Sequence, residues 1–148
     1  MTAIREAKDD DNLMICNLLR QHDLRPEGVL ESGTKYWVAE EGVDLIGAIG
    51  LELGQASVLL RSAIVDSHRR GKGIGRQLTE YALDWARLGG YRKAYCFSTD
   101  AGGYWVTRGF RACPVEEVVN ALPTAPQVKL FHRLGWLPTE VAYEITII

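Results

Sequence analysis

The stretch that decides the fold is Ile64–Leu78, Ile-Val-Asp-Ser-His-Arg-Arg-Gly-Lys-Gly-Ile-Gly-Arg-Gln-Leu. The apolar residues over 57–65 that lead into it predict a buried strand. Apolar residues three and four apart after it predict a helix from Ile74 that stops at Gly89, with a buried stripe formed by Ile74, Leu78, Tyr81, Ala82 and Trp85. Between the two, glycine at positions 71, 73 and 75 lets the backbone turn sharply and leaves room for a ligand. Because the first N–H groups of a helix lack partners and carry the positive end of its dipole, the stretch predicts a phosphate or pyrophosphate site.

The spacing of the glycines excludes two common phosphate loops. A P-loop requires Ser or Thr directly after Gly-Lys, and this chain has neither there. The dinucleotide pattern Gly-x-Gly-x-x-Gly fails from Gly71 and from Gly73, since Arg76 and Leu78 stand at the third glycine place. A plain connection, or a phosphate site of another kind, stays open at this point.

The pattern Arg70-x-x-Gly73-x-Gly75 lies within a string, Val65–Gly75, that resembles the acetyl-coenzyme A pyrophosphate loop of the GCN5-related N-acetyltransferase (GNAT) superfamily. The resemblance implies acetyl-CoA as cofactor, with loop N–H groups on its pyrophosphate and the preceding strand paired to its pantetheine arm. The cofactor-binding residues it implies are Ala63, Ile64, Val65, Arg70, Gly71, Lys72, Gly73, Ile74, Gly75, Arg76 and Trp105.

Length and composition limit the class of protein. We expect 148 residues to form one domain, 1–148, with a substantial core. A formal net charge of −2 argues against nucleic acid or an anionic membrane as partner. No apolar run has spanning length and no signal segment opens the chain, so we expect a cytoplasmic protein. Three cysteines and three scattered histidines predict reduced thiols and no metal site.

The order of the expected elements indicates an α/β fold, with a mixed, mostly antiparallel central sheet flanked by helices. That order is also the one of the GNAT acyl-CoA N-acyltransferase fold, so the resemblance covers nearly the whole chain. Asp100 is expected to cap one helix, and residues 24–30 to be irregular or a short helix. The strands are expected at 3–7, 36–40, 45–53, 57–65, 92–97, Phe110 and 141–147, and the helices after Asp9–Asp11 and over 74–88, 101–108, 114–122 and 126–134.

The resemblance implies direct attack of an acceptor amine on the acetyl carbonyl, and two common family features are missing. Members often have a glutamate on the strand beside the acetyl group, where this chain has Arg61 and Ser62. They often have a tyrosine five residues before the phenylalanine of Gly-Phe, where Trp105 stands. An indole can donate a hydrogen bond but cannot give up a proton. Tyr104 is the substitute acid that we consider, against plain core packing. Glu52, with Glu40 and Glu41, is a candidate water-mediated base, against the alternative of solvated turn charges.

An aromatic residue at that place resembles the amino-acid N-acetyltransferase branch, with N-acetylglutamate synthase domains and arsenic-resistance-associated acetyltransferases. The turn Leu24–Val29 resembles the substrate side of that branch, and the strand Ser57–Ser62 resembles its central strand. The candidate substrate-binding residues are Val29, Leu30, Arg61 and Ser62. A guanidinium in an apolar strand must be paired. Its partner is either a substrate carboxylate or, as a structural pair, Glu52 on the neighbouring strand.

The hypothesis from the sequence is an acetyl-CoA-dependent N-acetyltransferase acting on a small-molecule amine, such as an amino acid or an amino-acid-like compound. Two alternatives remain: a catalytically silent module that binds coenzyme A and regulates a partner, and a peptide or protein N-terminal acetyltransferase. A homodimer is an open alternative to a monomer, because no residues define an interface.

Overall fold

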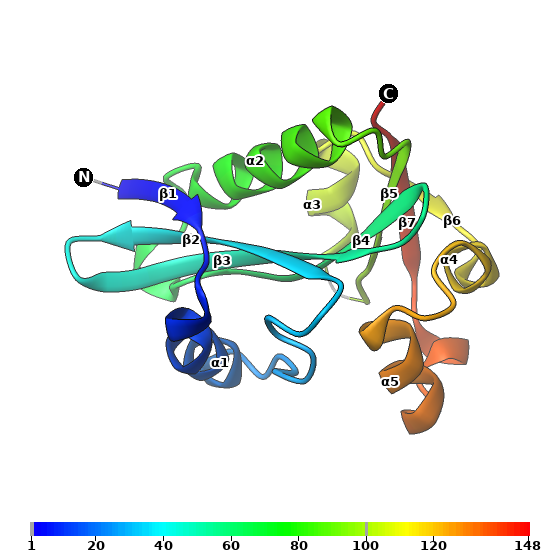
Figure 1. The fold of residues 1–148 in the computed structure, drawn as a ribbon, viewed down its shortest axis with the longest axis horizontal. Coiled ribbons are helices and arrows are strands. Elements are labelled where there is room, and N and C mark those ends of the chain that lie inside the picture. The colour runs from blue at the N-terminus through cyan, green and yellow to red at the C-terminus, as the bar shows by residue number, and fades with distance from the viewer. Residues whose placement is uncertain (1, 100) are drawn as a thin grey trace.

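The computed structural model describes residues 2–99 and 101–148, in which one seven-stranded sheet separates two layers of helices (Figure 1). The strand order is β1-β2-β3-β4-β5-β7-β6, and β4–β5 is the one parallel pair among the described strands. The predicted mixed, mostly antiparallel sheet is confirmed. The strands are β1 (Thr2–Glu6), β2 (Thr34–Glu41), β3 (Asp44–Leu53), β4 (Ser57–Val65), β5 (Lys93–Phe97), β6 (Arg111–Cys113) and β7 (Ala142–Thr146).

Helices cover both faces of this sheet. The helices α2 and α3 lie on one face, and α1 and α5 lie on the other (Figure 1). The bounds are α1 (Asn12–Gln21), α2 (Ile74–Leu88), α3 (Gly102–Thr107), α4 (Val115–Ala121) and α5 (Pro126–Leu134), with short 3-10 turns η1 (Asp9–Asp11), η2 (Ser67–Arg69) and η3 (Leu137–Thr139). The predicted cap Asp100 lies outside the described residues.

Strand β4 lies at the centre and is apolar because helices cover both of its faces. Val58 and Leu60 pack with α2, and Leu59 packs with α4 and α5 on the opposite face. Neither Leu59 nor Leu60 exposes more than 2% of its surface. Its bounds, Ser57–Val65, are the ones expected from the sequence.

The two halves of β4 are paired differently. Residues 57–60 pair with β5, and this pairing ends at Leu60 and Cys96 although β4 continues to Val65. On the other side, Ser62 and Ala63 stand opposite the single residue Ile49, which makes a β-bulge. Ser62 has a φ of 56°, in the left-handed region. Ala63 is exposed on a central strand as a result, since β5 does not cover it.

Some local expectations were wrong. Tyr81 was placed in the buried stripe of α2, but it is 51% exposed, and the stripe continues through Ala82 and Ala86. The short strand expected at Phe110 begins at Arg111, because Phe110 packs against Trp105 in the core. The segment before β2 is irregular, with Leu30 at a φ of 59°.

Candidate cofactor and acceptor site

The glycine turn before α2 has the open geometry that the sequence predicted. Gly71 and Gly73 have φ values of 82° and 79°, which L side chains rarely adopt. A Cβ added at either would meet no atom within 4 Å, so the space above the turn is open. Gly73 directly precedes α2, whose first N–H groups therefore face this space. The turn fits a diphosphate held by backbone N–H groups.

The basic residues around the turn divide into two kinds. Arg69 is held by Asp66 at 2.8 Å and Glu41 at 3.3 Å, and the hydrogen bond that Arg69 donates to Glu41 raises the pKa of its guanidinium. It therefore braces the turn. Arg70 and Lys72 are exposed beside the glycines. The Nε of Arg70 donates to the carbonyl of Val65 at 3.2 Å, which fixes its stem near the end of β4.

The gap beside the second half of β4 continues from this turn. Beyond Leu60 the β5-facing edge of β4 is not paired with β5, so main-chain groups over 61–65 have no strand partner on that side, although the Val65 carbonyl accepts from Arg70. An extended chain with amide groups, such as a pantetheine arm, fits this edge as an added strand does. Ile64 packs with the α1 cluster, and Val65 lies near Gly75 at the start of α2. The turn and the gap thus form one continuous site.

A buried ion pair lies on the α1 side of β4. The Nη1 of Arg61 donates to Oε2 of Glu52 at 2.8 Å, with 3% and 0% of the two side chains exposed. The other oxygen of Glu52 accepts the backbone N–H of Gln127, in the first turn of α5, at 2.9 Å. The Nη2 of Arg61 donates to the carbonyl of Arg25 at 3.1 Å. The pair therefore ties β3, β4, α5 and the segment before β2 together.

The contacts of this ion pair bear on two predicted roles, that of Glu52 as a base and that of Arg61 as the ligand of a substrate carboxylate. Burial raises the pKa of Glu52, an effect that Arg61 opposes. Since both oxygens of Glu52 have protein partners, the carboxylate has no free edge toward a water molecule. The structural Arg61–Glu52 pair considered from the sequence is present. The roles of Glu52 as base and Arg61 as carboxylate ligand stay predictions, and the contacts favour a scaffold.

Ser62 connects this pair to a buried tyrosine. Its Oγ accepts from Nε of Arg61 at 3.0 Å and lies 3.2 Å from the hydroxyl of Tyr36. Tyr36 is 1% exposed, and burial raises its pKa to about 12. A Cβ at Gly50 would lie 2.4 Å from its ring, so this glycine allows the ring to lie flat on β3. Sequence reasoning missed Tyr36, although a glycine opposite an aromatic residue in a predicted hairpin was available as a signal.

Tyr104 and Trp105 lie at the start of the short helix α3. The hydroxyl of Tyr104 is 3.4 Å from the Cβ position of Gly75, so it lies at the first turn of α2. Trp105 is 6% exposed and packs edge-on against Phe110. Core packing thus accounts for Trp105. The catalytic role of Tyr104 and the cofactor contact of Trp105 stay predictions.

Comparison with known proteins identifies the family. Residues 32–136 match the family described as Acetyltransferase (GNAT) domain, and this match covers most of the chain. The chain belongs to the GNAT acetyltransferase family. Acetyl-CoA is the cofactor that this family uses, and the open turn and gap fit it. The expected GNAT fold is therefore confirmed.

The relatives of this GNAT domain include N-acetyltransferase 8 of Mus musculus, 29% identical over 123 residues, which cover 76% of this chain and 54% of the relative. N-acetyltransferase 8B of Rattus norvegicus is 31% identical over 75 residues, 47% of this chain and 34% of the relative. The chain spans about half the length of the curated relatives that match most of it.

Solved structures share the fold of this GNAT domain. N-acetylglutamate synthase from Neisseria gonorrhoeae, complexed with coenzyme A and N-acetyl-glutamate, has a TM-score of 0.80 at 20% identity and covers 100% of this chain and 35% of that chain. The ribosomal-protein-S18-alanine N-acetyltransferase from Escherichia coli has a TM-score of 0.73 at 13% identity, over 99% and 94%. At these identities the likeness shows the fold alone.

On the face of the sheet that α1 and α5 cover, the segment before β2 contacts residues that follow α5. Val29 is buried with α1, and Leu30 follows it in a left-handed conformation. Arg25 lies over the ring of Trp136 at 5.6 Å, and Trp136 contacts Phe131 at 5.4 Å. Phe131 and Trp136 were not among the candidates from the sequence, since only the fold brings residue 25 to residue 136. The substrate-binding roles of Val29 and Leu30 stay predictions.

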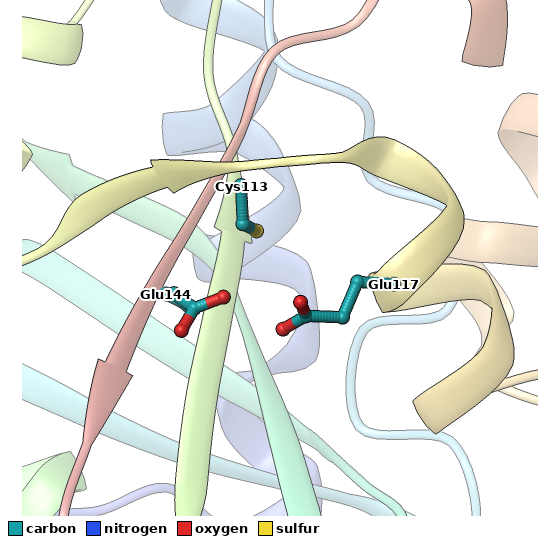
Figure 2. Close-up of side chains that lie close together, drawn as sticks. All are labelled: Cys113, Glu117 and Glu144. Atoms are coloured by element: carbon teal, nitrogen blue, oxygen red, sulfur yellow. The ribbon is translucent and has the colours of Figure 1, made fainter.

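A second cluster of polar residues lies away from the gap, where Cys113, Glu117 and Glu144 point toward one another (Figure 2). The Nζ of Lys93 lies 3.2 Å from Glu144 and 3.5 Å from Glu117, and Arg111 donates to Glu144 at 3.0 Å. Burial raises the pKa of Cys113 to about 12, so its thiol is neutral. Because two protein cations already neutralise the carboxylates, the cluster fastens β6 and β7 together.

In the described part of the chain, no helix combines the length and the apolar composition that crossing a bilayer requires.

Proposed function

We propose that this GNAT domain transfers the acetyl group of acetyl-CoA to the amine of a small molecule, an amino acid or an amino-acid-like compound. The observation that carries the proposal is the joined site: the open glycine turn at Gly71 and Gly73 leads directly into the gap beside the second half of β4. The bound cofactor supplies an activated acyl carbon, and the chain supplies its position.

Each part of the site has one task in this proposal. The N–H groups after Gly73 and the exposed charges of Arg70 and Lys72 hold the diphosphate. The main chain of 63–65 pairs with the pantetheine arm, which points the thioester toward Ser62. The acceptor enters from the side of Arg25 and Trp136. Holding donor and acceptor together supplies much of the rate, since an amine attacks a thioester readily once oriented.

The substrate class is supported by the acceptor side of the site. A carboxylate-bearing amine would find aromatic and cationic groups there, namely Trp136 and Arg25, and it would compete with Glu27 for the guanidinium of Arg25. The N-acetylglutamate synthase with the same fold binds N-acetyl-glutamate, an acylated amino acid. Phe97, the last residue of β5, contacts Phe131 of α5 with ring centroids 5.6 Å apart, so further aromatic side chains lie near the end of β5.

A silent coenzyme A-binding module is the second candidate. The sealed carboxylate of Glu52 and the indole of Trp105 favour it, because neither can exchange a proton with the acceptor. A peptide acceptor has its own support in the fold shared with the S18-alanine acetyltransferase.

The test mixes the protein with acetyl-CoA and each of the twenty amino acids, and with a peptide that has a free amino terminus, and measures thiol release. Titration calorimetry with coenzyme A runs in parallel. We expect binding and turnover with one or more amino acids. Binding without turnover on any amine would support the silent module, and turnover on the peptide alone would support the peptide acceptor. Absence of coenzyme A binding would overturn all three.

A further inference from the structure

Ser62 stands where the two halves of β4 meet, and its hydrogen bonds can be counted. A serine hydroxyl accepts two hydrogen bonds and donates one. An arginine nitrogen can only donate, so the contact of Arg61 Nε with Ser62 Oγ at 3.0 Å fills one lone pair of that oxygen.

Tyr36 fills the second lone pair. Its hydroxyl is buried, and Ser62 Oγ at 3.2 Å is its hydrogen-bond partner among the described residues. If Ser62 were the donor of this bond, the phenol proton would be buried without an acceptor, which is strongly unfavourable. The phenol is therefore the donor. It stays protonated at neutral pH, because its pKa is raised by burial to about 12.

With both lone pairs filled, the hydroxyl proton of Ser62 must point elsewhere. Within residues 2–99 and 101–148, no protein acceptor is in hydrogen-bond contact with it. Ser62 is half-buried, directly before the exposed Ala63, at the end of the gap farthest from the glycine turn. Its bulged backbone places it on the α1 side of the strand, next to Tyr36.

We propose that Ser62 is a catalytic residue that donates its hydroxyl proton in a hydrogen bond to the acyl oxygen during acetyl transfer, with Arg61 and Tyr36 as positioning residues. This inference rests on the proposed function. It also assigns the charge of Arg61 a task that requires no substrate carboxylate: to orient a neutral donor.

The chemistry balances without a proton leaving Ser62. The amine lone pair forms the C–N bond while the C=O π electrons move onto oxygen. They return as the C–S bond breaks and its electrons leave on sulfur, and the ammonium proton passes to water. Ser62 keeps its proton and stabilises the negative charge that develops on oxygen. A preorganised donor of this kind is typically worth on the order of 10²–10³-fold in kcat.

The test is the infrared carbonyl stretch of acetyl-CoA labelled with ¹³C at the acyl carbon, which needs no acceptor. In the wild-type protein we expect the bound stretch to lie below that of free acetyl-CoA, because a donated hydrogen bond weakens the C=O bond. In Ser62→Ala the stretch should return toward the free value. Ser62→Gly is the second variant. Glycine adopts a φ of 56° without strain, so this variant removes the hydroxyl without straining the backbone.

The matched control is Ser57→Ala, which removes a hydroxyl from the same strand within its paired half. It should leave the stretch unchanged, and Tyr36→Phe should shift it partway. With the best amino acid from the acceptor panel, Ser62→Ala should lower kcat on the order of 10²-fold and leave coenzyme A affinity unchanged. Equal stretches in wild type, Ser62→Ala and Ser62→Gly, all with coenzyme A bound, would overturn the role of Ser62 alone. Loss of coenzyme A binding by the wild type would instead overturn the proposed function.

Discussion

The two halves of β4 form one predicted strand in the sequence, but they have different roles in the fold. Over 57–60 the strand is paired on both edges and covered on both faces, as for Leu59 and Leu60. Over 61–65 it leaves β5, bulges at Ser62 and exposes Ala63. A central strand thus gains a free edge where a neighbouring strand, here β5, stops pairing with it. Two polar residues of β4, Arg61 and Ser62, lie at that point.

The largest effect should come from removing the charge of Arg61, where the two halves of β4 meet. Arg61→Leu leaves Glu52 ionised and buried without its partner, so the free energy of unfolding should fall by about 3–5 kcal/mol. Urea denaturation at pH 7 measures it. The control is the double variant Glu52→Leu with Arg61→Leu, which should recover most of the loss because no buried charge remains. If the single variant keeps full stability and loses only acceptor affinity, Arg61 binds the substrate carboxylate instead.

Truncation within the paired half should cost slightly less. Leu60→Ala leaves a cavity under α2 and should lower the free energy of unfolding by about 3 kcal/mol. Coenzyme A affinity of the folded protein should not change, since Leu60 lies before the gap. Ala63→Ser, in the second half, is the control and should change stability by less than about 0.5 kcal/mol. A large drop in coenzyme A affinity for Leu60→Ala would mean that the two halves are not separate in function.

Two buried carboxylates, Glu144 on β7 and Glu52 on β3, should respond to acid in opposite directions. Hydrogen bonds with Glu117, and then with Arg111 and Lys93, lower the pKa of Glu144 to about 2, against the effect of burial. Its contribution to stability is therefore present above about pH 4.5 and is lost as the pH falls toward 2. Burial raises the pKa of Glu52, so the folded state takes up this proton before the unfolded chain does, and protonation of Glu52 favours the folded state as the pH falls.

Glu144→Gln tests this contrast. The variant should lose about 2 kcal/mol at pH 7, the value of a hydrogen bond to a charged group, and should lose less stability than wild type between pH 4.5 and 2. Thermal unfolding over that pH range measures the slope. Glu80→Gln, at an exposed pair on α2, is the control and should leave the slope as it is. Parallel slopes for wild type and Glu144→Gln would contradict the assignment.

The glycine turn was predictable from the sequence and the gap was not. Gly71, Gly73 and the strand and helix around them are local, so spacing and turn chemistry were sufficient. The gap depends on where β5 stops pairing, at Cys96, and that is set by contacts between residues far apart in the chain. Likewise Arg61 and Glu52 could be paired from a predicted hairpin, whereas the hydrogen bond from Gln127 could not.

The glycine turn offers a comparison with a matched partner. Gly73 and Gly90 have φ values of 79° and 89°, and neither has an atom within 4 Å of an added Cβ. Alanine at either position should therefore lower the free energy of unfolding by a similar amount, about 1–2 kcal/mol, through strain of the left-handed backbone. Only Gly73→Ala places a methyl group in the diphosphate space, so it alone should weaken coenzyme A binding. We expect the affinity to fall about tenfold or more, which corresponds to about 1.4 kcal/mol.

Calorimetry with coenzyme A and urea denaturation of both variants separate strain from contact. Gly90 lies after α2, at the end opposite the turn, so a methyl group there does not contact the diphosphate. Equal losses of affinity in Gly73→Ala and Gly90→Ala would mean that strain transmitted through α2, rather than the space above the turn, governs binding.

The smallest effect should come from the phenol at the other side of the turn. Because the Tyr104 hydroxyl lies beside Gly75, Tyr104→Phe should weaken coenzyme A binding about fivefold, the ~1 kcal/mol of one hydrogen bond, and leave kcat nearly unchanged. Tyr81→Phe, half-exposed on α2, is the control for loss of a phenol and should change neither value. Calorimetry and thiol release give the two numbers. A large fall in kcat with intact affinity would instead make Tyr104 the acid of the reaction, and the reacting thioester would then lie nearer α3 than Ser62.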